Sequence, residues 1–160
     1  MNVTIRRAVV GDEQALTRLN AFVHDLHVAS KPLYFKPAVP EDVAAWFKGL
    51  LERSTVRIWI AERDGTAVGY VSVFLRERGE NIFGHARQWL ELDQIGVHPD
   101  DRRGGIGRAL VDVVLQAAET DRIRDVELSS WAFNKGAQQA FRRLGFTPTV
   151  VRFARESSKA

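Results

Sequence analysis

The sequence predicts a single mixed α/β domain over residues 1–160. Its length of 160 residues suits one domain that buries a sizeable core. Runs in which apolar and polar residues alternate are interleaved with runs whose apolar residues recur at three- and four-residue spacing. Their order, β-α-α-β-β-β-α-β-α-β, is interrupted by no internal repeat, low-complexity tract or linker. This interleaving favours one layered α/β domain.

The first third of the chain predicts one strand and two helices. Residues 3–7 alternate in polarity as a strand does, and Asp12 follows as the N-cap of a helix. The apolar residues of that helix form one face over residues 15–26. Residues 27–40 contain three prolines and no period, so we expect a loop there. A second helix is predicted from Pro40, because proline and acidic residues suit a first turn.

The rest of the chain predicts further strands and two more helices. Residues 56–63 and 67–75 are rich in strand-forming residues and are joined by a turn containing Asp-Gly, which indicates a hairpin. Residues 76–87 are polar and contain glycine, and residues 89–97 form the next expected strand. A helix is then expected from Ile106. The remaining predictions are a strand at 126–131, a helix at 134–144 and a final strand at 150–154.

Residues 102–110, RRGGIGRAL, are an unusual way to begin a helix. Glycines are poor helix formers, and arginines crowd an end that already carries positive partial charge. Glycine permits positive φ and close approach of a ligand, while the first amides of a helix lack internal partners. The stretch therefore suits a diphosphate, whose charge would offset the repulsion between the arginines. Its spacing matches neither a Rossmann nor a Walker motif, and a turn without a ligand is the alternative.

Composition narrows the classes of function. The chain has no cysteine, which excludes disulfides and favours a reducing compartment. It has neither a signal-peptide pattern nor about 18 consecutive apolar residues, so we expect a cytoplasmic protein with no membrane partner. The net charge is +3, and acidic residues are interspersed among the arginines, so we expect no nucleic-acid partner. His24 and His27 have no nearby third ligand, and no metal is expected.

Two motifs in this chain resemble those of one enzyme family. Residues 97–110, VHPDDRRGGIGRAL, resemble the acyl-coenzyme A motif of the GNAT superfamily of N-acetyltransferases, Arg/Gln-x-x-Gly-x-Gly/Ala, at Arg102, Gly105 and Gly107. Residues 134–146, NKGAQQAFRRLGF, are similar to a second family motif. The resemblance in element order covers nearly the whole chain. It implies a GNAT-like domain with a central mixed, twisted sheet of about six or seven strands, flanked by about four helices.

The resemblance also implies which residues bind acetyl-CoA. Backbone groups of Ile95, Gly96 and Val97 would pair with the pantetheine arm, and Asn134 would hydrogen-bond it. The pyrophosphate would lie against the motif arginine and the amides that follow it, which belong to Arg102, Arg103, Gly104, Gly105, Ile106, Gly107 and Arg108. The alternatives are a strand glycine at a bulge for Gly96 and a helix cap for Asn134.

The catalytic groups follow from the same resemblance. The amide of Ile95 would stabilise negative charge on the thioester oxygen. Asp93 would act as the base that deprotonates the amine, although an edge carboxylate paired with arginine, with water as the base, is the alternative. Phe141 stands where family members commonly place a tyrosine general acid, so Ser129, Ser130 or water would have to replace it.

The resulting hypothesis is an N-acetyltransferase that moves an acetyl group from acetyl-CoA to a primary amine by direct attack. The acceptor would be a small molecule or a peptide, and the family resemblance allows a homodimer. Because of Phe141, a non-catalytic acyl-CoA-binding or regulatory module is the alternative. A test by coenzyme binding and thiol release separates the two.

Overall fold

The structure, a computed structural model, describes residues 3–157. The chain divides into two compact units, Met1–Ser129 and Ser130–Ala160. The first unit contains the sheet and its helices, and the second contains helix α4 (Lys135–Arg143). The expectation of one domain over residues 1–160 stays a prediction.

The mixed sheet predicted from the sequence is confirmed, with five strands in the part of the chain described. They are β1 (Val3–Arg7), β2 (Val56–Arg63), β3 (Thr66–Arg78), β4 (Arg87–Val97) and β5 (Asp125–Leu128). The sheet order follows the chain, β1-β2-β3-β4-β5. The first four strands pair antiparallel, whereas β4 and β5 pair parallel. Parallel pairing requires a crossover, and the helix between these two strands provides it.

The strand count of six or seven is too high for the described residues. The expected strand at 150–154 is extended chain outside any ladder, and β5 ends at Leu128 rather than at 131. Alternating polarity favours an extended backbone, but a strand also needs a neighbour to supply hydrogen bonds. The sequence pattern does not specify that neighbour.

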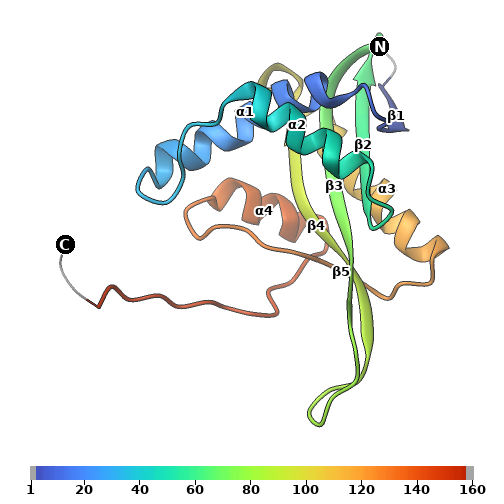
Figure 1. Ribbon diagram of the computed structural model, residues 1–160, viewed down its shortest axis with the longest axis vertical. Coiled ribbons are helices and arrows are strands. Elements are labelled where there is room, and N and C mark those ends of the chain that lie inside the picture. The colour runs from blue at the N-terminus through green and yellow to red at the C-terminus, as the bar shows by residue number, and fades with distance from the viewer. Residues whose placement is uncertain (1–2, 158–160) are drawn as a thin grey trace. The chain divides into compact units, whose positions relative to one another are not determined.

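The polar segment at 76–87 also differs from expectation, because β3 continues to Arg78 and β4 begins at Arg87. The two strands form a long hairpin that extends well beyond the helices of the first unit (Figure 1). Polar residues are tolerated here because cross-strand pairs continue along the hairpin, for example Glu77 opposite Gln88.

Helices cover both faces of the sheet in the first unit. Helices α1 (Glu13–Ser30) and α2 (Pro40–Leu51) lie on one face, and α3 (Ile106–Thr120) lies behind the strands (Figure 1). Strand β3 is buried from Val68 to Phe74 because it is covered on both sides. The core between the sheet and α1 and α2 is formed by Ala8, Leu16, Leu19, Phe47, Leu50, Val56, Ile58, Ile60, Tyr70 and Phe74.

Asp12 occupies the predicted N-cap position of α1, but its side chain makes no capping hydrogen bond. Its carboxylate instead accepts two hydrogen bonds of 2.8 Å from Arg6 and one of 2.8 Å from the amide of Val9. The hydrogen bonds of Asp12 therefore connect the start of α1 to the end of β1.

Candidate functional site

The pairing between β4 and β5 ends just before the residues that are predicted to bind the pantetheine arm. The parallel pairing with β5 ends at Leu92 opposite Leu128. Beyond that point β4 continues to Val97 and pairs with β3 on its other side. Within residues 3–157, the edge of β4 over residues 93–97 therefore has no β-ladder partner on the β5 side. Such an edge presents backbone donors and acceptors that an extended ligand can pair with.

Asp93 is the extra residue of a β-bulge in this strand. Ser72 of β3 lies opposite Gln94, and the next residue, Val73, lies opposite Leu92, so Asp93 has no counterpart. A bulge bends the strand and redirects its side chains, which is why bulges are frequent next to active sites. The sequence predicts Asp93 as a site residue but gives no signal for the bulge itself.

The surroundings of Asp93 hold its pKa above the ordinary value of an aspartate. Partial burial is the main cause, since it disfavours the charged form, and the negative charge of Glu91 adds to it. Arg76 acts in the opposite direction and pairs with Glu91 at 3.1 Å. A solvent-accessible carboxylate with a raised pKa is a stronger proton acceptor than an ordinary aspartate.

The glycine turn, defined here as residues 98–105, connects β4 to α3. It begins with a short 3₁₀ helix, Pro99–Asp101, and ends at Gly105, the N-cap of α3. Arg103 and Gly105 both have left-handed backbones, with φ of 67° and 81°. At Gly105 this conformation favours glycine, because a Cβ atom is strained there.

Gly107 has a different reason to be glycine. A Cβ atom at this position would lie 4.0 Å from Cγ2 of Val97, its nearest neighbour, so the fold has room for a side chain. The first-turn amides of α3 lack partners within the helix and carry the positive end of its dipole. A glycine here keeps the approach to those amides open.

The three arginines of the motif surround this helix start. Arg102, Arg103 and Arg108 are all exposed, and Nε of Arg102 donates a hydrogen bond of 3.2 Å to the carbonyl of Val97. Cationic side chains and helix-start amides thus occur together next to the open edge of β4. This combination suits an anionic ligand that continues into an extended arm.

Gly96 is glycine for a reason that the sequence does not reveal. A Cβ atom there would lie 2.9 Å from Cε1 of Tyr70 and 3.0 Å from Cγ2 of Val23. The missing side chain therefore makes room for a buried tyrosine and for helix α1 rather than for a ligand. The predicted backbone role of Gly96 in binding is not affected by this and stays a prediction.

Tyr70 anchors a polar cluster that sequence reasoning missed. Its hydroxyl donates a hydrogen bond of 2.7 Å to Oε1 of Gln94, and Nδ2 of Asn20 donates to both, at 3.2 Å to the hydroxyl and 3.0 Å to Gln94. Burial raises the pKa of Tyr70 well above its ordinary value, so the phenol stays protonated. The cluster links α1 to β4 beside Asp93, and it is brought together by the register of β3 and β4 and by the packing of α1 on the sheet.

Asn134 and Phe141 belong to the second unit. Oδ1 of Asn134 accepts a hydrogen bond of 3.2 Å from the amide of Ala137, as an N-cap of α4 does. Phe141 lies within α4 and contacts Phe146 edge to face, with ring centroids 6.0 Å apart. The capping role of Asn134 is thus observed, and its role toward a ligand stays a prediction.

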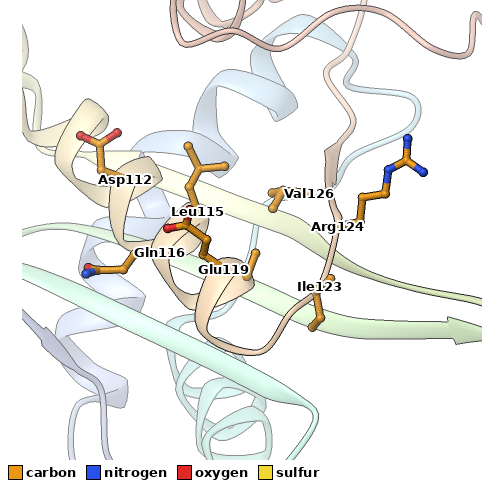
Figure 2. Close-up of a pocket in the computed structure, with 8 residues that line it drawn as sticks. Asp112, Leu115, Gln116, Glu119, Ile123, Arg124 and Val126 are labelled. Carbon is orange, nitrogen blue, oxygen red and sulfur yellow. The ribbon is translucent and has the colours of Figure 1, made fainter.

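A groove of about 560 Å³ lies beside the later turns of α3 (Figure 2). Figure 2 shows side chains from α3 on one side and Val126 of β5 on the other, with Arg124 extending away from the helix. Along the helix, Glu119 lies roughly 18 Å from Gly107 at 1.5 Å per residue. The groove is therefore separate from the glycine turn. It is lined by Asp112, Leu115, Gln116, Ala118, Glu119, Ile123, Arg124 and Val126.

The described part of the chain contains neither a helix that could span a membrane nor a cluster of metal-ligating side chains. Between residues 3 and 157, no helix has the length and apolar character needed to cross a membrane. Over the same residues, no three histidine, aspartate or glutamate side chains gather as a metal site would require.

Comparison with known proteins adds relatives by sequence. An uncharacterized N-acetyltransferase of Methanocaldococcus jannaschii is 36% identical over 109 residues, which are 68% of this chain and 47% of the relative. Mycothiol acetyltransferase of Amycolatopsis mediterranei is 30% identical over 156 residues, 96% of this chain and 50% of the relative. This chain spans about half the length of these two curated relatives.

Solved structures share the fold. A mutant form of a protein from Bacillus halodurans matches with a TM-score of 0.92 at 20% identity, covering 96% of this chain and 98% of that one. An aminoglycoside N-acetyltransferase in complex with CoA matches with a TM-score of 0.76 at 20% identity, covering 98% and 96%. The sequence model of the acetyltransferase (GNAT) family matches residues 20–146. Because that match spans most of the chain, including the open edge of β4 and the glycine turn, this protein belongs to the GNAT family of acetyltransferases.

Proposed function

We propose that this protein is an N-acetyltransferase that uses acetyl-CoA and acetylates a primary amine. One observation carries the proposal: the unpaired edge of β4 over residues 93–97 leads directly into a turn of left-handed backbone, arginines and helix-start amides. An extended arm that ends in a diphosphate matches this succession of groups. Coenzyme A is such a ligand, and the acetyl-CoA thioester supplies an activated acetyl group.

The order of the residues along the chain matches the order of the groups in the coenzyme, with the pantetheine arm at β4 and the diphosphate at the start of α3. The backbone of Ile95, Gly96 and Val97 would hold the pantetheine arm by strand-like hydrogen bonds. The amides of residues 103–108 would bind the diphosphate, with Arg102 and its neighbours supplying positive charge. Gly107 supports this assignment, because the space where its side chain would lie is open.

The chemistry of transfer falls to two groups on β4. The amide of Ile95 would donate to the thioester oxygen as negative charge develops there. Asp93, with its raised pKa, would take the proton that the amine loses as its nitrogen bonds to the carbonyl carbon. The carbon–sulfur bond then breaks and the sulfur leaves as a thiolate, which afterwards takes a proton from water, so no tyrosine is required.

The nature of the acceptor is proposed as a class only. Relatives and fold neighbours are named for mycothiol, for an aminoglycoside and for a ribosomal-protein alanine, and they thus include small-molecule and protein substrates. We propose a small-molecule or peptide amine. The acceptor panel for this protein should include both kinds.

The first experiment is calorimetric titration of the full chain with acetyl-CoA, followed by assay of free thiol release with a panel of amines. Binding together with release would support the enzyme and indicate its acceptor class. Binding without release from any amine would favour the non-catalytic acyl-CoA module. Failure to bind would overturn the assignment of the glycine turn.

Asp93→Asn separates chemistry from binding. Turnover should fall by about 10²-fold or more, the usual loss for a general base, while affinity for acetyl-CoA stays within about twofold of the wild type. The acid limb of the pH–rate profile should disappear. An unchanged rate and profile would remove Asp93 from the mechanism and leave water as the base.

A further inference from the structure

An ion pair from a distant strand reaches the glycine turn. Arg63 is the last residue of β2, and its guanidinium pairs with the carboxylate of Asp101 in the 3₁₀ helix after β4. Strand β3 lies between β2 and β4, so the arginine side chain spans the start of β3 to make this contact. Arg63 lies outside the stretch that resembles the coenzyme motif, Asp101 is at none of the three matched motif positions, and the resemblance assigns no role to either.

Asp101 is also held by the turn itself. Its amide donates a hydrogen bond of 2.9 Å to the carbonyl of His98, and its second carboxylate oxygen lies 3.6 Å from Nδ1 of the same histidine. The amide of His98 in turn donates to the carbonyl of Val68 in β3 at 2.8 Å. The start of the turn is therefore connected to both β2 and β3.

The guanidinium of Arg63 lies close to Gly104. A Cβ atom on Gly104 would be 3.5 Å from Nη2 of Arg63 and 3.4 Å from the carbonyl oxygen of Asp101. Nε of Arg63 is buried and has no hydrogen-bond partner within residues 3–157, so the side chain is enclosed at this point. The pair thus lies next to Gly104, which stands between the left-handed residues Arg103 and Gly105.

We propose that Arg63 and Asp101 form a positioning pair that holds the glycine turn in the conformation that binds the coenzyme diphosphate. The inference rests on the proposed function, because it concerns the affinity of that same site. The pair fixes the 3₁₀ helix against the sheet, and the left-handed residues after it then direct their amides toward the ligand. The arginine also offsets the negative charge of Asp101, which would otherwise repel a diphosphate.

Arginine suits this role better than lysine. Its planar guanidinium can bind the carboxylate with one nitrogen while another lies near Gly104, and less freedom is lost for each hydrogen bond. The exposed fractions of the two side chains are 26% for Arg63 and 13% for Asp101. Charge-assisted hydrogen bonds between partly buried groups are stronger than those of exposed pairs.

The direction in which one substitution changes the affinity for CoA distinguishes a positioning role from a purely electrostatic effect. Asp101→Asn removes a negative charge beside an anion site, so charge alone predicts tighter binding of CoA. A positioning role predicts weaker binding, by roughly tenfold, because the ion pair becomes a hydrogen bond to a neutral amide oxygen and holds the turn less firmly against β2. Asp100→Asn is the matched control, since it makes the same charge change one residue earlier on a side chain that is 90% exposed.

The experiment is calorimetric titration of the full-length wild type, Asp101→Asn, Asp100→Asn and Arg63→Gln with CoA, ADP and pantetheine. We expect Asp101→Asn and Arg63→Gln to lose affinity for CoA and ADP, which contain the diphosphate, and to bind pantetheine as the wild type does. The Asp100→Asn variant should bind all three like the wild type or slightly more tightly. In Asp101→Asn and Arg63→Gln, the KM for acetyl-CoA should rise while kcat stays at the wild-type value.

Several outcomes would overturn the inference and can be told apart from failure of the proposed function. Equal or tighter CoA binding by Asp101→Asn, in a wild type that binds CoA, contradicts the positioning role alone. Equal losses for pantetheine and ADP would indicate general destabilisation instead. If Asp101→Asn does not fold, Arg63→Lys replaces it, with the same fragment comparison. Absence of CoA binding by the wild type removes both proposals.

Discussion

Two aspartates of this protein have pKa values shifted in opposite directions. Hydrogen bonds from Arg6 are the main reason that the pKa of Asp12 is held below its ordinary range. Partial burial is the main reason that the pKa of Asp93 is held above it. Asp12 thus stabilises the folded state when it is charged, as a structural carboxylate does. Asp93 favours the folded state when it is neutral, as is typical of a candidate base.

The two shifts predict opposite effects of pH on stability. Asp93 has a folded pKa above its unfolded value, so its ionisation destabilises the fold as pH rises through that interval. Asp93→Asn should therefore raise Tm at neutral pH, with the gain vanishing in acid. Asp12→Asn should lower Tm at neutral pH, and the loss should shrink as pH falls below the ordinary aspartate pKa. Thermal unfolding of both variants from about pH 3 to 7 checks the signs. A gain at neutral pH for Asp12→Asn, or a loss for Asp93→Asn, would contradict these environments.

Gly107 allows stability and binding to be separated at a single residue. Its Cβ space is open, and glycine in a helix is less stable than alanine by about 0.5–1 kcal/mol. Gly107→Ala should therefore keep or raise the free energy of unfolding. Gly107→Glu should also fold, but its carboxylate would occupy the diphosphate position and abolish coenzyme binding. Denaturant unfolding and CoA titration of both variants are the measurements. A Gly107→Glu protein that binds CoA normally would disprove the diphosphate assignment.

At the scale of elements, strand β4 combines the features on which the site depends. It pairs with β3 along its whole length and with β5 only to Leu92, and it carries a bulge at Asp93. The polar cluster of Asn20, Tyr70 and Gln94 attaches it to helix α1 on one face. The shape of the open edge is therefore supported by buried contacts on the far side of the strand.

Gly96→Ala tests this support. The added methyl would lie 2.9 Å from the ring of Tyr70, which is fully buried and whose hydroxyl is held by hydrogen bonds with Asn20 and Gln94. Overpacking of this kind costs about 1–3 kcal/mol. Gly107→Ala is the control, because the same change meets nothing closer than 4.0 Å there. Denaturant unfolding should show a loss for position 96 only. Equal stabilities would mean that β4 and α1 can shift apart at no cost.

At the scale of the whole molecule, coenzyme binding should stabilise the fold. A ligand at 100 times its Kd adds about 2.7 kcal/mol to the free energy of unfolding. For a chain of 160 residues this corresponds to a rise in Tm of roughly 5–10 °C. We expect that rise with CoA in the wild type and none in Gly107→Glu. A similar rise in both proteins would place CoA away from the glycine turn.

The fold and the site differ in how far the sequence predicts them. The order of elements from residue 3 to 144 follows from local periods and from turn signals such as Asp64-Gly65. The glycine turn and the start of α3 are also predictable from the sequence, since their glycines and arginines lie within seven residues of the chain, 102–108. The expected strand at 150–154 is wrong for the described structure, because pairing depends on a partner that is distant in sequence.

The sequence by itself determined the order of helices and strands up to residue 144 and which backbone segment suits an anionic ligand, because both depend on residues near one another in the chain. Tertiary structure alone decided the bulge at Asp93, the contact of Tyr70 with Gly96, and the approach of Arg63 to Asp101. Each of these joins segments that are far apart in the chain. Strand register fixes the bulge and the Tyr70 contact, whereas the ion pair depends on how the 3₁₀ helix after β4 packs beside the end of β2. Neither cause has a signature within any single segment.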